Sequence, residues 1–169
     1  MSDDLENTPP EPKYETFDTQ QGFDAAVERL LDQPGRELRV FDPDLLALRL
    51  ESEARVERLR AFLRASRTRR LFAVVHDTDH LTKRCPRMMS LLGTYSHAIQ
   101  IYQTPEDLKS LQDSFLVLDA DHYVRRAVAR FFRGAMGLND PGEGLAMRGR
   151  FTEIWTASHP AVSATTLGL

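Results

Sequence analysis

The chain has 169 residues, of which 41% are hydrophobic and 28% charged, and its formal net charge at pH 7 is −3. This length suits one domain with a sizeable core and argues against a second full domain. The charge balance shows no basic excess, so it gives no strong nucleic-acid signal. No apolar run approaches the roughly 18–20 residues of a membrane span.

The cysteine count and the first residues bear on the cellular compartment. Cys85 is the only cysteine, so no internal disulfide can form, which suits a reducing cytosol. The start of the chain is acidic and proline-rich and contains no apolar stretch of signal-peptide type. The sequence therefore predicts a cytoplasmic protein that does not associate with a membrane.

Two hydrophobic patterns alternate along the chain. Apolar residues at i, i+3, i+4 and i+7 predict helices, and short apolar runs between turn residues predict buried strands. In chain order, these patterns predict a helix over 23–31, a strand over 37–41, a helix over 50–65, a strand over 70–75, a helix from 86 to about 93, strands over 98–102, 115–118 and 122–124, and a helix over 146–157.

The order of these elements predicts the fold class and the domain organisation. Helices join the first strands, which are therefore expected to be parallel with right-handed crossovers, whereas the last two strands should form a hairpin. We expect an α/β three-layer sandwich with a mostly parallel central sheet and a late antiparallel hairpin. This single domain spans residues 20–160, after a disordered lead-in over 1–19 and before a loose tail over 161–169. The glycine-rich stretch 127–144 is expected to be a long loop.

The stretch 71–80 is the strongest indication in the sequence of a buried strand and of a candidate site. Five apolar residues, typical of a strand buried on both faces, run directly into five polar ones. Ligand crevices of α/β proteins lie where such strands end. The residue types suit a divalent metal such as zinc, iron or manganese, and the candidate ligands are His76, Asp77, Asp79 and His80.

Not all four of these side chains can converge, because neighbours in an extended chain point to opposite sides. A metal site would need a further ligand from another strand end, and the candidates are Asp42, Asp44 and Asp119. The alternative is that Asp77 and Asp79 cap the following turn, while the histidines are surface or hydrogen-bonded residues.

Cys85 is a second candidate, because Pro86 after it is typical of a helix start. The backbone N–H groups and dipole of that helix would stabilise a thiolate, and Arg84 and Arg87 would add positive charge. A reactive thiol or an anion-binding site is one interpretation, and an inward-facing thiol packed in the core is the other. A thiol enzyme would also need a base, for which the candidates are His80, His97 and His122.

Residues 112–119 resemble the closing strand motif of one half of a phospholipase-D-like unit. That family places a histidine, then a lysine two residues on, then an aspartate five residues later; here the positions hold Gln112, Ser114 and Asp119. The helix end over 151–158 also fits the pattern. The resemblance implies a phospholipase-D-like fold without the phosphodiesterase chemistry, since the His-x-Lys pair is absent. Such halves commonly pair, which implies a homodimer.

Several short stretches together resemble an uncharacterised proteobacterial domain family that is sometimes fused to a GNAT-type acetyltransferase. The stretches are 75–77, 84–87, 97–101, 115–119 and 154–155. The resemblance implies a lineage and an acyltransferase as a partner, and it assigns no activity.

The sequence favours a non-catalytic domain that binds a protein partner or an anionic, phosphate-bearing ligand at the strand ends. The candidate ligand-binding residues are Asp42, Asp77, Arg84, Cys85, Arg87 and Asp119. One alternative is a metal-dependent hydrolase or transferase that uses the cluster from His76 to His80. The other is a thiol-based enzyme or sensor at Cys85. No cofactor is predicted beyond the divalent metal of the first alternative.

Overall fold

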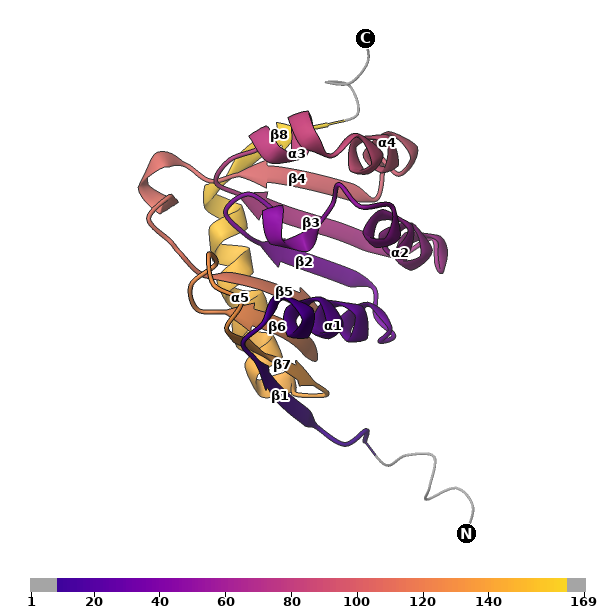
Figure 1. Ribbon diagram of the computed structural model, residues 1–169, viewed down its shortest axis with the longest axis vertical. Coiled ribbons are helices and arrows are strands. Elements are labelled where there is room, and N and C mark those ends of the chain that lie inside the picture. The colour runs from indigo at the N-terminus through magenta and orange to yellow at the C-terminus, as the bar shows by residue number, and fades with distance from the viewer. Residues whose placement is uncertain (1–8, 164–169) are drawn as a thin grey trace.

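The computed structural model describes residues 9–163, which build one eight-stranded mixed sheet with helices on both faces (Figure 1). In chain order, the elements are β1 (Lys13–Phe17), α1 (Gln20–Leu31), β2 (Glu37–Phe41), the 3-10 helix η1 (Leu46–Leu48), α2 (Glu53–Arg64), β3 (Arg70–Val75), α3 (Asp79–Arg84), α4 (Pro86–Thr94), β4 (Ile99–Gln103), the 3-10 helix η2 (Glu106–Leu108), β5 (Ser114–Leu118), β6 (His122–Arg126), β7 (Gly134–Leu138), α5 (Pro141–Ala157) and β8 (His159–Val162).

The strand order across the sheet is β1-β7-β6-β5-β2-β3-β4-β8. The pairs β2–β3 and β3–β4 are parallel, as expected for strands joined by helices. The other five neighbouring pairs are antiparallel. The predicted mostly parallel sheet is therefore wrong: the sheet is mixed and mostly antiparallel. The predicted hairpin is confirmed as β5–β6.

Strand β3 lies inside the sheet between two parallel neighbours, as its apolar run predicts. Leu71, Ala73, Val74 and Val75 are buried on it. The side chains point alternately to the two faces of the sheet. Ala73 and Val75 belong to the core under α1, α2 and α4, whereas Val74 belongs to the core on the other face. The carboxyl ends of β2, β3 and β4 consequently meet at one edge of the sheet.

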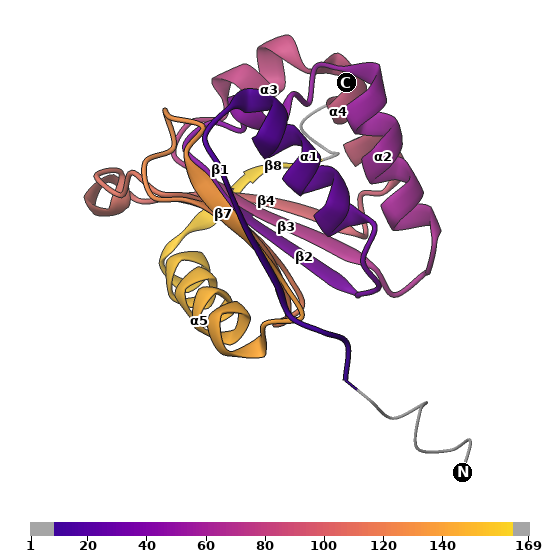
Figure 2. The ribbon, with the colours of Figure 1, turned by 60° about the horizontal axis from the view of Figure 1, so that its bottom comes forward.

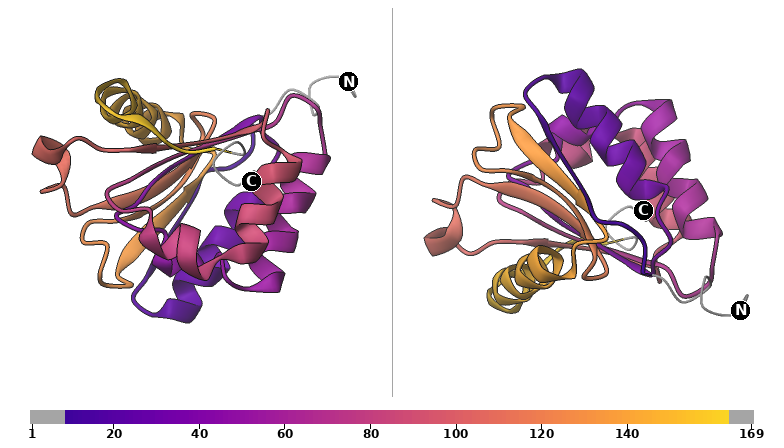
Figure 3. Two further views of the ribbon diagram at one scale, coloured as in Figure 1. Left: turned by 90° about the horizontal axis from the view of Figure 1, so that it is seen from above. Right: turned by 90° about the horizontal axis from the view of Figure 1, so that it is seen from below.

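Helices cover the two faces unequally. The helices α1, α2 and α4 pack on one face, and α5 crosses the other alone (Figures 2 and 3). Helix α5 buries Met147, Phe151 and Ile154 against side chains that include Phe41 and Tyr123. The predicted three layers are present.

The helix starts follow from their caps. The Thr19 side chain accepts a hydrogen bond from the Gly22 amide at 3.1 Å, and the Ser52 side chain accepts one from the Arg55 amide at 3.2 Å. Helix α2 therefore begins at Glu53 rather than at residue 50. Helix α5 begins at Pro141 rather than at 146, with Asp140 as its cap.

Three strands lie where the sequence predicts none. The expected disordered lead-in over 1–19 contains β1, the expected loop over 127–144 contains β7, and the expected loose tail over 161–169 begins inside β8. Residues 1–8 and 164–169 lie outside the described residues. All three strands pair antiparallel with their neighbours and lie at or near the outer strands of the sheet. They are held by main-chain hydrogen bonds and lack the apolar sequence pattern by which a strand is predicted.

Strand β7 shows why glycine replaces the usual apolar residues there. A Cβ at Gly137 would lie 2.3 Å from the ring of Tyr123 on the neighbouring strand, and a Cβ at Gly134 would lie 2.0 Å from the Arg125 carbonyl oxygen. These glycines let β7 lie close to β6, although in the sequence they are typical of a loop.

Within residues 9–163, no helix combines the length and apolarity that crossing a bilayer requires.

Candidate functional site

Three buried polar residues meet at the edge where β2 and β3 end. Asp42 follows β2, Ser114 begins β5 and Arg126 ends β6. They converge because β5 runs antiparallel to β2 and β6 runs antiparallel to β5, which brings the start of β5 beside the ends of both neighbours. Each of the three residues is only 2% exposed. We call them the edge network.

The Asp42 carboxylate is the centre of the edge network. Its Oδ1 accepts hydrogen bonds from Ser114 Oγ at 2.6 Å and from Arg126 Nη2 at 2.9 Å. Its Oδ2 accepts the backbone amides of Asp44 at 3.1 Å and Leu45 at 2.6 Å. Burial raises the pKa of the Asp42 carboxyl, and these four donors oppose the rise. The carboxylate is therefore occupied as a structural acceptor.

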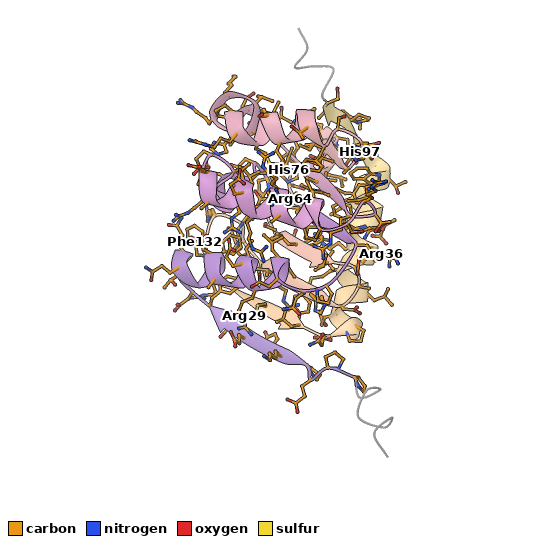
Figure 4. All side chains as sticks on the ribbon, turned by 90° about the vertical axis from the view of Figure 1, so that its right-hand side faces the viewer. Arg29, Arg36, Arg64, His76, His97 and Phe132 are labelled. Atoms are coloured by element: carbon orange, nitrogen blue, oxygen red, sulfur yellow. The ribbon has the colours of Figure 1, made fainter. Side chains whose placement is uncertain are left out.

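Arg126 is enclosed on the side of α1. Its guanidinium carbon lies 4.4 Å from the centre of the Phe23 ring and 5.8 Å from that of Phe132. Phe132 itself lies beside α1 (Figure 4). The Nη1 group donates to the carbonyl of Ala129, which anchors the loop after β6. Burial lowers the pKa of Arg126, and the charge of Asp42 opposes this effect.

The sequence indicates Asp42 as a candidate but does not indicate Arg126 by any motif. The signal was present in the alternation of β6, because Arg126 follows His122 and Val124 at a period of two, on a face that is otherwise buried. A charged residue at such a position needs a buried partner of opposite charge, and Asp42 is that partner.

The structure does not bring the predicted metal cluster together. The two ring nitrogens of His76 lie 2.7 Å from Thr104 Oγ1 and 2.8 Å from the Leu111 carbonyl oxygen. Because a carbonyl can only accept, Nε2 donates to the Leu111 carbonyl, while Nδ1 shares a hydrogen bond with the Thr104 hydroxyl. Both nitrogens are thus occupied by protein groups.

The rest of that cluster points elsewhere. Asp77 Oδ1 accepts the Asp79 amide at 2.8 Å, which is the capping role considered as the alternative. Asp79 pairs with Lys83 on the surface, at 3.6 Å. His80 turns toward Glu51, which precedes α2.

Asp119 follows the end of β5 and lies beside the start of β2, at the opposite ends of the strands from Asp77. The expected pocket with Asp77 and Asp119 therefore does not form. The Asp119 carboxylate accepts the backbone amides of Arg36 and Glu37, both at 3.0 Å. The expectation fails because β5 is antiparallel to β2, which places the end of β5 at the start of β2. Asp119 holds a turn in the left-handed conformation, with φ of 53°.

The basic residues and the thiol near α4 also lie apart from the edge network. Arg84 is exposed, and Arg87 donates to the Glu51 carbonyl at 3.4 Å. Cys85 is fully buried, and burial, together with the charge of Glu51, raises the pKa of its thiol to about 11. The structure thus favours the inward-facing interpretation, because a thiol enzyme needs a lowered pKa.

A groove of about 1150 Å³ opens beside the edge network. It lies between α5 and the loop after β6 and extends along β7 to β1. Four arginines line it: Arg125, Arg126, Arg133 and Arg150. Its rim also carries Tyr14 and Phe131, both large and exposed. Clefts with this mixture of aromatic and cationic side chains can hold an anionic ligand.

The fold is similar to that of phospholipase D family members. It resembles Nuc, a phospholipase D family member from Salmonella typhimurium, with a TM-score of 0.67 and 11% identity over 90% of this chain and 100% of that one. NucT from Helicobacter pylori gives a TM-score of 0.60 and 11% identity over 89% and 100%. The archaeal chromatin protein TrmBL2 gives 0.63 and 11% over 94% and 58%.

Residues 19–167 match the family described as "Domain of unknown function (DUF7931)". The chain therefore belongs to that family. None of the curated proteins matches the sequence significantly. The structural likenesses, at 11% identity, establish the fold and leave the activity to the residues of this chain.

Proposed function

We propose that this domain is a non-catalytic phospholipase-D-like binding module that takes a phosphate-bearing ligand in the arginine-lined groove. The observation that carries the proposal is the edge network itself. The resemblance assigns the positions of the family's histidine and lysine to Gln112 and Ser114, and Ser114 is locked between Asp42 and Arg126. Nucleophilic catalysis needs a nucleophile with an adjacent free base, which this arrangement does not offer.

One free cation among the described residues of the groove supports an anionic ligand. Arg126 is already paired with the buried Asp42, so the lining carries Arg125, Arg133 and Arg150 against three carboxylates, which are Asp18, Asp113 and Glu143. Arg133 is exposed and forms no ion pair with any described residue. Arg125 pairs with Glu143 at 3.1 Å and Arg150 with Asp113 at 2.8 Å, both near the surface. The single hydrogen bond of Arg125 to Glu143 contributes little, so a phosphate group can compete for its guanidinium group. Arg150 forms two hydrogen bonds to Asp113, so a phosphate must replace a stronger, bidentate pair there.

The exposed aromatic residues support a ligand with planar groups. Tyr14 and Phe131 lie at the rim, 59% and 54% exposed. Aromatic rings beside arginines provide stacking surfaces along a phosphate backbone. We therefore choose a fluorescently labelled single-stranded oligonucleotide as the binding probe.

Fluorescence anisotropy at two salt concentrations tests the proposal. We expect saturable binding that weakens with salt. Arg133→Glu and Arg150→Glu should each weaken binding about ten-fold or more, since each loses a charge-assisted contact and adds a repulsive charge. Arg64→Glu is the matched control, because Arg64 is exposed at the end of α2, outside the groove (Figure 4). Equal weakening by all three variants would place binding outside the groove and reject the proposal.

A hydrolysis assay tests the non-catalytic part. We expect no turnover of a generic phosphodiester above the buffer rate. Turnover that disappears in a folded Ser114→Ala variant would show catalysis at the edge network and overturn this part.

The predicted homodimer, acyltransferase partner and proteobacterial lineage rest on family resemblance and stay predictions. Light scattering of the purified chain tests the homodimer.

A further inference from the structure

Three side chains with metal-binding atoms meet outside the groove and the edge network. Glu51 precedes α2, His80 lies in the first turn of α3, and Cys85 joins α3 to α4. One carboxylate oxygen, one imidazole nitrogen and the thiol sulfur all lie within 4.8 Å of one another. The backbone brings them together because the chain leaves helical geometry at Cys85, with φ of −122° and ψ of 62°, and turns the thiol inward.

The Cys85 sulfur and the His80 Nε2 atom form no hydrogen bond with any of the residues 9–163. Cys85 is fully buried, and the Nε2 atom of His80 is buried as well. Its nearest carboxylate oxygen, on Glu51, lies 3.7 Å away, which is too long for one. A buried nitrogen without a partner carries a desolvation cost that a ligand would remove.

We infer that Glu51, His80 and Cys85 bind one divalent metal ion of the zinc class. The donor set of thiolate, imidazole and carboxylate matches zinc, whereas calcium and magnesium prefer oxygen alone. The thiol proton leaves to solvent when the sulfur binds the metal. The two negative ligands then balance the two positive charges of the ion.

The spacing of the three ligands fits a tetrahedral site. Metal–ligand bonds of about 2.0–2.3 Å place the ligand atoms of a tetrahedron about 3.3–3.8 Å apart. A nitrogen and an oxygen ligand would lie about 3.3–3.5 Å apart, so the 3.7 Å between His80 and Glu51 must shorten slightly. The other two separations are at most 4.8 Å and must shorten by up to about 1 Å. The Glu51 side chain, which is 47% exposed, is free to move toward the other two ligands.

The fourth position of the site would take water or a small ligand. The opening lies on the side of Glu51, because Cys85 is buried and the His80 side chain is only 19% exposed. A bound ion would tie the segment before α2 to the α3–α4 junction. Since binding occurs to the folded chain, it would also raise the free energy of unfolding.

Cobalt and zinc titrations of the full chain test the inference. Co²⁺ should give a thiolate-to-metal charge-transfer band with intense visible bands of tetrahedral cobalt, and Zn²⁺ should displace it at one ion per chain. Glu51→Gln and His80→Ala should each weaken Co²⁺ binding ten-fold or more, and Cys85→Ala should remove the charge-transfer band. His97→Ala, which changes an exposed histidine, should bind cobalt as the natural chain does.

Glu51→Gln keeps the test decisive even if a variant at the buried Cys85 does not fold. It changes one partly exposed oxygen to nitrogen and preserves the shape of the side chain. If Glu51→Gln and His80→Ala bind cobalt as tightly as the natural chain, the three-ligand site is refuted. The same holds if the folded natural chain gives no charge-transfer band. Neither result bears on oligonucleotide binding in the groove.

Discussion

Removal of the Arg126 charge should be among the most damaging single changes to the edge network. Arg126→Met keeps much of the length of the side chain but leaves the Asp42 carboxylate without its cationic partner, in a place that is 2% exposed. Breaking a buried pair by removing one partner costs about 3–5 kcal/mol. We expect a loss of this size in the free energy of unfolding at pH 7.

Arg125→Met is the matched control, since Arg125 is the adjacent residue on the same strand. Its side chain points to the opposite face and pairs with Glu143 near the surface, and such a pair contributes less than about 1 kcal/mol. Urea unfolding followed by the fluorescence of Trp155 and by circular dichroism measures both variants. With a slope of about 2 kcal/mol per M, Arg126→Met should move the midpoint by about 2 M.

The loss should also depend on pH, with a definite sign. Without Arg126, the pKa of Asp42 rises further above its ordinary value, because burial then acts with less opposition. Below the unfolded pKa, about 3.9, the carboxyl is neutral in both states; as the pH rises through the folded value, the variant loses stability. The cost should therefore be smaller near pH 4 than at pH 7, and Asp42→Asn added to Arg126→Met should recover part of it. A cost equal to that of Arg125→Met, unchanged with pH, would refute a buried charge pair.

Two further predictions use the same unfolding assay. Gly144→Ala should lower the free energy of unfolding by about 1–3 kcal/mol, since the new Cβ would lie 2.1 Å from the Ala120 carbonyl oxygen. Gly149→Ala, with open space around it, should raise the free energy of unfolding by about 0.5–1 kcal/mol. A loss of stability in both variants would refute the steric argument. Burial first, and then the charge of Asp140, raises the pKa of Tyr123 to about 12. The resulting stability is complete below about pH 10 and is lost as the pH rises toward 12. Tyr123→Phe should lose less stability than the natural chain over this interval, and identical losses would contradict the shift.

The apolar runs that the sequence shows belong to strands buried on both faces. Strands β3 and β5 consist mostly of continuous apolar residues, because helices cover both sides of the sheet there. Strand β2 alternates instead: Leu38 and Val40 are buried, whereas Glu37 and Arg39 are half-buried. Strand β1 could not be predicted in this way, because its side chains are exposed, except for the half-buried Phe17. It is held mainly by pairing with β7, together with the contact of Phe17 with Phe23 on α1. Such pairing is decided by the rest of the fold.

The sequence predicts where some of the candidate residues lie, but not which side chains they contact. Asp42 and His76 lie at the strand edge where the apolar run of β3 points. Asp119 was assigned to that edge on the assumption of parallel strands, and the reversed direction of β5 moves it to the other edge. The sequence names His80 as a metal ligand and as a base for Cys85, but it does not point to Glu51, which lies near both in space and is distant from them in sequence. The spacing of residues along the sequence cannot show contacts, such as those of Glu51 with His80, that form only when the chain folds.

The path of α5 has a consequence for protein synthesis. This 17-residue helix, about 25 Å long, carries the chain across the sheet from β7 to β8, which pairs with β4. Strand β4 ends at Gln103 and its neighbour β8 begins at His159, a difference of 56 residues. At about 5–20 residues per second, a ribosome needs about 3–11 s to make that interval. During that time the outer hydrogen-bonding groups of β4 have no neighbour, so β4 is open to pairing with a strand of another nascent chain.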